Sequence, residues 1–128
     1  MRYHIDTGFL IYALSIAGPE RRRLLQLAES EAELQMSAVA WYEFSRGPRT
    51  PEQLSIARSF FFDDGIIPFS EELATMAGAV FRSIGSPRRR GADVAIGITS
   101  AAMGATLLTR NSGDFAGIPS LQLEAVDQ

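Results

Sequence analysis

Four acidic residues are the positions in this chain that could do chemistry together: Asp6, Glu43, Asp93 and Asp114. Carboxylates that share a small space repel one another and raise each other's pKa, so a cluster of them needs a stabilising partner. A divalent cation is such a partner, and hard oxygen ligands suit Mg²⁺ or Mn²⁺. The first hypothesis is therefore a metal site built from these four carboxylates.

Each of these acids, taken alone, also has an ordinary structural explanation. Asp6 could cap a helix, and Asp93 could complement a helix dipole. Asp114 could serve a tight turn, and Glu43 could lie on a solvated helix face. The metal hypothesis depends on whether the fold brings the four together.

The elements that would position these acids alternate along the chain. Strands are expected at residues 2–5, 34–36, 66–69, 105–109 and, at an edge, 121–126, and helices at 7–15, 20–31, 38–46, 51–62, 71–84 and 92–103. Such alternation indicates an α/β domain with a largely parallel sheet. No linker interrupts the pattern, so a single domain over residues 1–128 is expected.

A parallel sheet would bring the four acids to one edge, because ligands bind outside the carboxyl ends of its strands. Asp6 closes the first strand there, and Glu43 lies in the second turn of the helix that follows the second strand. Asp93 lies in the first turn of a helix whose N-terminus faces the same edge, and Asp114 follows the fourth strand. Order and direction of the elements therefore predict a shared acidic site.

Composition narrows the classes of function. The absence of cysteine excludes disulfide frameworks and thiolate catalysis. The lack of cysteine also indicates a cytoplasmic location. No apolar run approaches the ~18–20 residues of a membrane span, so no membrane partner is expected. The net charge of −3 argues against binding of nucleic acid by global charge. All twelve basic side chains are arginine, however, and they cluster at 21–23, 46/49 and 88–90, where planar guanidinium groups could bind phosphate.

Local motifs around the acids resemble a known family. A hydroxyl follows a carboxylate in Asp6-Thr7 at the expected strand end, and polar oxygens precede an acid in the turn Thr109–Phe115. The segments Asp6–Tyr12, Glu43, Asp93–Ile96 and Thr109–Phe115 together resemble a PIN domain, most closely the VapC-type ribonuclease toxins of bacterial toxin–antitoxin pairs. The resemblance runs through the whole chain in order.

The resemblance implies a three-layer α/β/α sandwich with a mainly parallel sheet of four or five strands. It implies an endoribonuclease that depends on Mg²⁺ or Mn²⁺, with the four acids as catalytic residues and metal ligands and with Thr7 and Asn111 as supporting polar groups. A homodimer and a VapB-like antitoxin, whose tail lies across the acidic groove, are also implied. Two positions depart from the family pattern: Gly8 stands where Asn or Ser is common, and Gly97 stands where Ala is common.

The residues also indicate how such a site would work. Carboxylates would hold one or two cations, which lower the pKa of a bound water and stabilise charge on the phosphoryl oxygens as a P–O bond of RNA is cut. No histidine base is expected, because His4, the single histidine, lies before Asp6 on a strand where it would pack or be solvated. The cation, with one carboxylate as proton acceptor, would have to supply the nucleophile.

Four arginines are expected to bind the RNA backbone: Arg110 beside the site, and Arg88, Arg89 and Arg90 before the helix of Asp93. The run at 88–90 could instead be a solvated turn. The same arginines, or Arg46 and Arg49, could also contact a partner protein.

The aromatic residues Phe60–Phe62, Trp41 and Tyr42 are more numerous than a one-sided helix needs. They are either core or part of a dimer or antitoxin surface, because exposed apolar patches mark interfaces. The sequence leaves both interpretations open.

Other functions are weighed against the nuclease. Asp6-Thr7-Gly8 is also the active-site triplet of aspartic proteases, but those enzymes are nearly all β, whereas this sequence favours helix. Phosphoacceptor domains and haloacid-dehalogenase-like phosphatases gather acids at a sheet edge, but they usually need a lysine, which this chain lacks. A housekeeping PIN nuclease and a non-catalytic PIN-like binding module stay as alternatives.

Overall fold

The strands form one sheet of five parallel strands in the order β3-β2-β1-β4-β5. A computed structural model describes residues 1–126 of the chain. The strands are β1 (Arg2–Ile5), β2 (Glu33–Ser37), β3 (Ile66–Ile67), β4 (Thr106–Thr109) and β5 (Gln122–Ala125). The helices are α1 (Thr7–Ser15), α2 (Pro19–Ala28), α3 (Ala38–Ser45), α4 (Pro51–Arg58), α5 (Glu71–Ser83) and α6 (Gly91–Ala102), with 3₁₀ turns η1 (Arg88–Arg90) and η2 (Ser112–Phe115).

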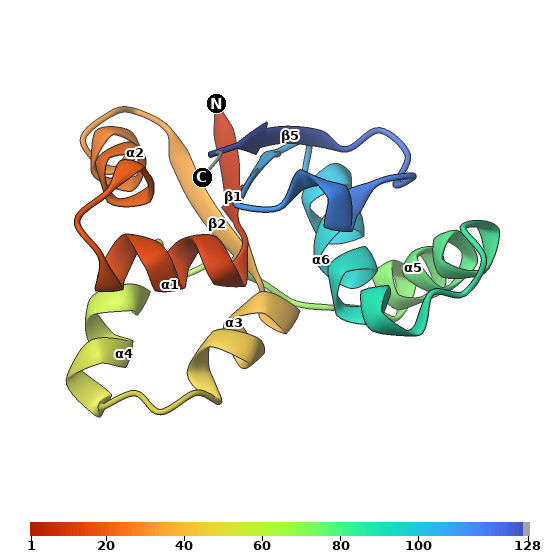
Figure 1. Cartoon of the computed structure of the whole chain (residues 1–128), viewed down its shortest axis with the longest axis horizontal. Helices are drawn as coiled ribbons and strands as arrows, with labels where there is room; N and C mark the ends of the chain where they lie inside the picture. Colours follow the sequence, from red (N-terminus) through yellow and green to blue (C-terminus); the bar gives the residue numbers. More distant parts are fainter. Residues whose placement is uncertain (127–128) are drawn as a thin grey trace.

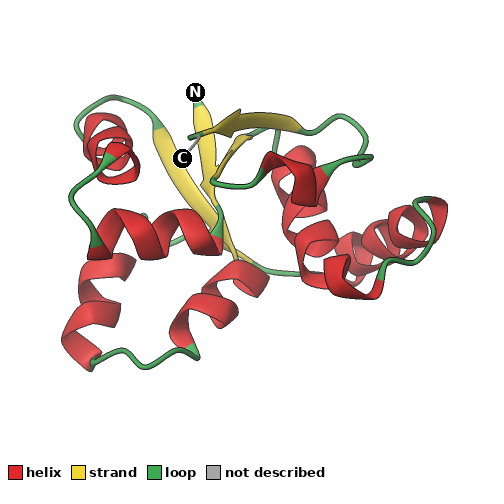
Figure 2. Cartoon of the chain, in the orientation of Figure 1, coloured by secondary structure: helices red, strands yellow, loops and turns green. Residues whose placement is uncertain are grey.

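Helices cover the sheet on two sides, as Figures 1 and 2 show. Helices α1 and α2 pack together on one side, and α5 and α6 pack together on the other. Central strands covered in this way are buried on both faces and read as apolar runs, and Ile5, Leu107 and Leu108 are fully buried. The expected α/β/α sandwich with a parallel sheet is therefore confirmed.

Helix starts follow the capping residues in the sequence. Ser37 and Ser70 accept hydrogen bonds from the amides of Ala40 (3.0 Å) and Leu73 (3.2 Å), and Thr50 forms a reciprocal capping box with Gln53. Helix α6 ends before Gly104, whose φ of 65° is the left-handed conformation that a glycine tolerates. These caps fix where the chain turns toward the edge that carries the acids.

Helix α4 is shorter than expected, because it ends at Arg58 rather than near Phe62. The Arg58 guanidinium donates to the carbonyls of Phe61, Phe62 and Asp63 and holds the chain in a turn. Helix α2 likewise ends at Ala28 rather than at residue 31. Strand β3 spans two residues only, since Pro68 after it has no amide to donate to a neighbouring strand.

Some of the aromatic residues lie in the core, and others are exposed as a partner surface would require. Phe61 is buried, and the ring of Trp41 stacks on that of Phe44 with centroids 5.7 Å apart, so both contribute to the core. Phe62 and Tyr42 are 70% and 60% exposed and are open to a partner. No helix within residues 1–126 is long and apolar enough to span a bilayer.

Candidate active site

Asp6 follows β1 directly and is held by the sheet. Its amide donates to the carbonyl of Leu108 at 3.0 Å, which extends the pairing of β1 with β4 by one residue. Its Oδ1 accepts the amide of Thr7 at 2.8 Å, and its Oδ2 accepts the hydroxyl of Thr109 at 3.0 Å. The carboxylate is therefore fixed at the carboxyl edge of the two central strands.

Glu43 reaches the same edge from α3. Its Oε1 accepts the hydroxyl of Thr7 at 3.0 Å, and that hydroxyl also lies 3.3 Å from the carbonyl of Ala40. Thr7 is the first residue of α1 and directly follows Asp6, so one short segment contacts both Asp6 and Glu43. The structure thus places Thr7 where a supporting polar group was expected.

Asp93 and Asp114 come from the other side of the sheet, and Arg90 joins their segments. Asp93 lies in the first turn of α6, and Asp114 lies in η2. The Arg90 guanidinium donates from Nε to the carbonyl of Asp114 at 2.9 Å and from Nη2 to the carbonyl of Ala116 at 2.6 Å. The residue before α6 therefore fixes the turn that carries the fourth acid.

The charge of each carboxylate affects the pKa of its neighbours at this edge. Burial raises the pKa of Asp6 to about 6, the charges of Glu43 and Asp114 add to this, and the hydrogen bonds from Thr109 and Thr7 oppose it. Burial also raises the pKa of Asp93 to about 6, with Asp6, Asp114 and Glu43 adding to the effect and Arg90 opposing it. Four acids from four separate segments thus share one electrostatic environment.

The donor set fits a hard divalent cation in its chemistry, because every candidate ligand is a carboxylate and the repulsion among them is what a cation would relieve. The side chains are not drawn into a closed ligand shell. Within residues 1–126, no three histidine, aspartate or glutamate side chains are close enough to hold an ion together. The structure therefore shows convergence of charge without a formed coordination sphere.

The expected RNA-binding arginines differ in their surroundings. Arg110 donates to Oε2 of the buried Glu20 at 3.3 Å, and its guanidinium lies 3.3 Å from the ring centroid of Tyr12. Arg90 is bound to backbone carbonyls. Arg88 and Arg89 are exposed in η1. Two of the four guanidinium groups thus make internal contacts, and two face solvent.

Thr109 is a site residue that sequence reasoning missed. Its hydroxyl donates to Asp6 and accepts the amide of Asn111 at 3.0 Å, so it connects the first acid to the turn after β4. The side chain of Asn111 itself is exposed. The pairing register of β1 with β4 would have predicted this contact. Ile5 pairs with Leu108, so the residues that follow them, Asp6 and Thr109, are neighbours across the two strands.

His4 packs inside the protein. Its Nε2 lies 2.9 Å from Oε1 of Gln35 on β2, and burial lowers its pKa to about 4. The imidazole is neutral at pH 7 and sealed from solvent. It is therefore no general base for chemistry at the sheet edge, as the sequence indicated.

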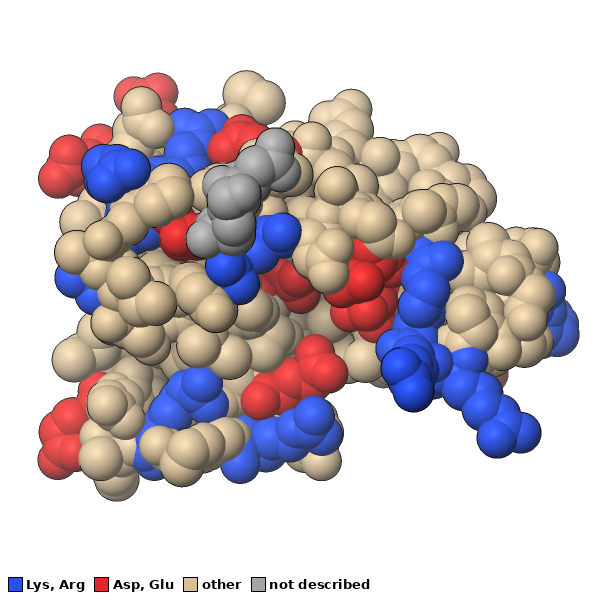
Figure 3. Space-filling view, viewed as in Figure 1, with Lys and Arg blue, Asp and Glu red and all other residues tan. Residues whose placement is uncertain are grey.

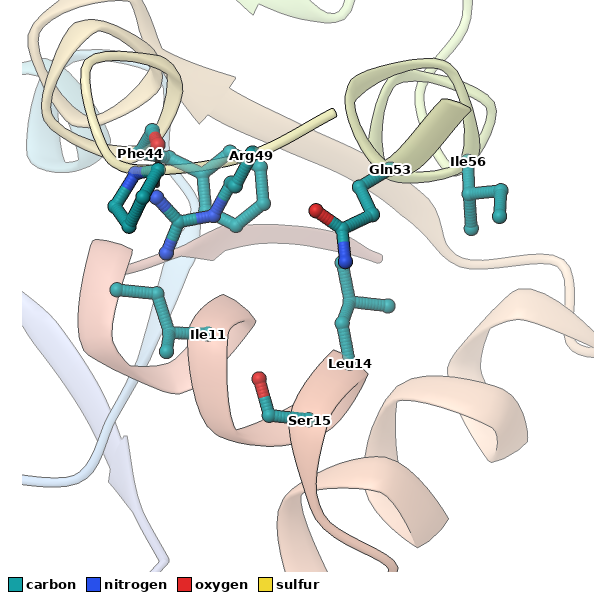
Figure 4. Close-up of a pocket in the computed structure, with 8 residues that line it drawn as sticks. Ile11, Leu14, Ser15, Phe44, Arg49, Gln53 and Ile56 are labelled. Atoms are coloured by element: carbon teal, nitrogen blue, oxygen red, sulfur yellow. Dashed lines mark hydrogen bonds between the residues drawn. The ribbon is translucent and has the colours of Figure 1, made fainter. Parts of the chain in front are cut away.

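An apolar pocket lies between α1, α3 and α4 (Figure 4). Its volume is about 250 Å³, and it is lined by Ile11, Leu14, Ser15, Phe44, Pro48, Arg49, Gln53 and Ile56. The Arg49 guanidinium lies 4.1 Å from the ring centroid of Phe44. Phe44 directly follows Glu43 in α3, and Ile11 lies one turn beyond Thr7 in α1, so the same two helices carry residues of the pocket and of the candidate site.

A sequence model of the PIN domain matches residues 3–120, which is most of the chain. The chain belongs to the PIN domain family. This confirms the family assignment made from the motifs. No curated protein matches the chain by sequence.

Solved structures with the same fold come from toxin–antitoxin complexes. VapBC2 from Rickettsia felis, bound to a promoter DNA fragment, is 25% identical with a TM-score of 0.75, covering 99% of this PIN domain and 100% of that chain. A toxin–antitoxin complex from Klebsiella pneumoniae is 27% identical with a TM-score of 0.69, covering 93% and 94%. DNA-bound VapBC from Salmonella typhimurium, 17% identical with a TM-score of 0.71 and covering 99% and 98%, shares the fold. These likenesses agree with the VapC-type resemblance.

Proposed function

We propose that this PIN domain is a metal-dependent endoribonuclease that acts in the cytoplasm as the toxin of a toxin–antitoxin pair. The observation that carries the proposal is the convergence of Asp6, Glu43, Asp93 and Asp114 at the carboxyl edge of the sheet, where the pKa of Asp6 and that of Asp93 are raised. Membership of the PIN family and likeness to toxin–antitoxin structures support it.

The four carboxylates would hold Mg²⁺ or Mn²⁺, which when bound supplies an activated water and offsets charge on the scissile phosphate. Asp6 is held by Thr7 and Thr109, so its carboxylate would be available to the ion in one fixed orientation. Glu43 is oriented by the Thr7 hydroxyl. Asp93, whose pKa burial raises to about 6, would be the candidate carboxylate to accept a proton.

Exposed arginines beside the acidic site would bind the phosphates of the RNA. Arg88 and Arg89 are exposed in η1, immediately before α6 and Asp93. Figure 3 shows basic side chains on both sides of the acidic groups on this face. Arg90 and Arg110 would act on the substrate indirectly, by holding the turns on either side of Asp114.

An antitoxin and a second copy of the chain are the proposed protein partners. A VapB-like segment would seat apolar side chains in the pocket of Figure 4 and run on across the acids, because α1 and α3 carry residues of both. Exposed apolar side chains such as Phe62 and Met76 support an interface with a second copy.

Cleavage of RNA by the purified protein tests the nuclease. We expect cleavage with Mg²⁺ or Mn²⁺ and none with a chelator. Asp6→Asn and Asp93→Asn are expected to abolish cleavage while circular dichroism shows the same fold. Equal cleavage by wild type and both variants would identify a contaminating nuclease, and metal-loaded wild type without activity would favour a non-catalytic PIN-like module.

Expression of the protein alone tests the toxin. We expect growth arrest that Asp93→Asn abolishes and that a small protein encoded next to it relieves. Harmless expression of an enzyme that is active in the cleavage assay would instead favour a housekeeping nuclease.

A further inference from the structure

Helix α3 carries an exposed aromatic–cation pair directly beside an acidic site residue. Tyr42 precedes Glu43 and is 60% exposed. Arg46 follows one turn later, and its guanidinium carbon lies 5.4 Å from the ring centroid of Tyr42, within cation–π range.

The helix places this pair on the solvent side of Glu43. Successive residues of a helix are about 100° apart around its axis, so Tyr42 and Arg46 lie on adjoining positions next to Glu43. Ala40 and Phe44 face the core on the opposite side. Figure 3 shows basic groups next to acidic ones over α3.

Arg46 is free to bind a ligand, unlike its neighbours. The Arg49 guanidinium packs on Phe44 and donates to the carbonyl of that residue, and Arg90 and Arg110 are held by internal acceptors. No carboxylate of residues 1–126 lies within salt-bridge distance of Arg46. Arg46 at the end of α3 and Arg88 and Arg89 in η1 are therefore available to bind a ligand on the two sides of the acids.

We propose that Tyr42 and Arg46 form a nucleotide-binding subsite for single-stranded RNA, an inference that rests on the proposed nuclease function. A base stacks on the face of the Tyr42 ring that the guanidinium does not cover, and Arg46 binds the adjoining phosphate. The strand then crosses the acids toward Arg88 and Arg89. Single-stranded RNA is the substrate class, because bases paired in an A-form helix do not offer a face for stacking.

Local contacts must supply the affinity, because the chain as a whole repels a polyanion with its net charge of −3. Stacking does not depend on global charge and tolerates any base, since every base has a π-face. The Arg46 guanidinium also limits the movement of the ring, which lowers the entropy lost when a base binds. The subsite would therefore bind the RNA next to the scissile bond with little preference for any base.

Binding of a short, fluorescently labelled single-stranded RNA to the full chain tests the subsite. Asp93→Asn serves as the parent protein, so that RNA is bound and not cut, and anisotropy is measured without divalent cations. We expect Tyr42→Ala to weaken binding about 5- to 100-fold and Tyr42→Phe, which keeps the ring, to bind like the parent. Arg46→Ala should weaken binding and lower the slope of affinity against salt by about one.

Matched controls separate the subsite from general surface effects. Leu25→Ala removes an exposed apolar side chain and Arg22→Ala removes an exposed arginine, both on α2, and both variants should bind RNA like the parent. Affinity of Tyr42→Ala within about twofold of the parent would overturn the subsite. A change in oligomeric mass by light scattering with unchanged RNA affinity would also overturn it, because Tyr42 would then contact another protein chain.

The outcomes distinguish this inference from the proposed function. Metal-dependent cleavage by wild type, together with unchanged RNA binding by Tyr42→Ala, would leave the nuclease standing and remove the subsite. Absence of both cleavage by wild type and RNA binding by the parent would remove both.

Discussion

The carboxylate of Asp6, a candidate site residue, is bound by two hydrogen bonds, and its charged form still lowers the stability of the folded protein. Two donors, the amide of Thr7 and the hydroxyl of Thr109, bind its carboxylate, yet burial raises its pKa to about 6. The charged form is therefore less stable in the folded protein than in the unfolded chain, where the pKa is 3.8. Between these values the folded state binds the proton that the unfolded state has released, so stability falls as pH rises through this range and stays low above it.

We expect Asp6→Asn to stabilise the metal-free protein by about 3 kcal/mol at neutral pH, because the variant lacks the buried charge that raises the pKa from 3.8 to about 6. The gain should shrink as pH falls below 6 and vanish near pH 4, where wild type is protonated as well. Urea unfolding in the presence of a chelator, across that pH range, measures it. Asp64→Asn at an exposed position is the control, and the same pH dependence for wild type and Asp6→Asn would contradict the role of burial.

At the scale of elements, α6 positions the site through close packing at its middle as well as through Arg90 at its start. Gly97 faces the segment after η2, and a Cβ built at this position would lie 2.6 Å from Cδ1 of Ile118. Real Cβ atoms do not approach so closely, so the glycine lets α6 lie against the chain that carries Asp114 and Phe115. The departure from alanine at Gly97 thus has a structural reason.

A double-mutant cycle at this contact has a defined expectation. Gly97→Ala requires Cδ1 of Ile118 to move, and because this atom ends a flexible side chain, the overpacking cost should roughly offset the helix-propensity gain of about 1 kcal/mol. Ile118→Val removes the Cδ1 that the new methyl would meet, so in the Gly97→Ala background it should cost less than its usual ~0.5–1.5 kcal/mol, or stabilise. Denaturant unfolding of the four proteins measures the coupling, and additive effects would contradict close contact.

At the scale of the whole molecule, the sequence predicted the alternation of elements, the parallel sheet and the gathering of the acids. Those features follow from local patterns and from the direction of the strands. Contacts between residues far apart in the sequence could not be predicted: Arg110, for example, donates to Glu20 across 90 positions. For the same reason, the sequence could not tell which arginines bind acceptors within the protein and which face solvent.

Mg²⁺ or Mn²⁺ should stabilise the whole fold, because the ion binds only the folded arrangement of the carboxylates. An ion at 100 times its dissociation constant adds about 2.7 kcal/mol to the free energy of unfolding. The gain should be larger at about pH 8 than at about pH 5, because Asp6 and Asp93 must be ionised to bind and each has a pKa of about 6. Thermal unfolding with and without the ion measures this, and Asp6→Asn should lose most of the gain. An unfolding temperature that the ion leaves unchanged at both pH values would contradict metal binding.

The order of strands in the sheet also bears on synthesis of the protein. Strand β4 pairs with β1 in the middle of the sheet although β2 and β3 are synthesised before it, and Asp114 follows it. A nascent chain on the ribosome therefore has an open edge at β1 and only three of its four acids until β4 and η2 have been synthesised. If the protein is the toxin proposed above, its candidate active site is assembled last, when β4 pairs with β1.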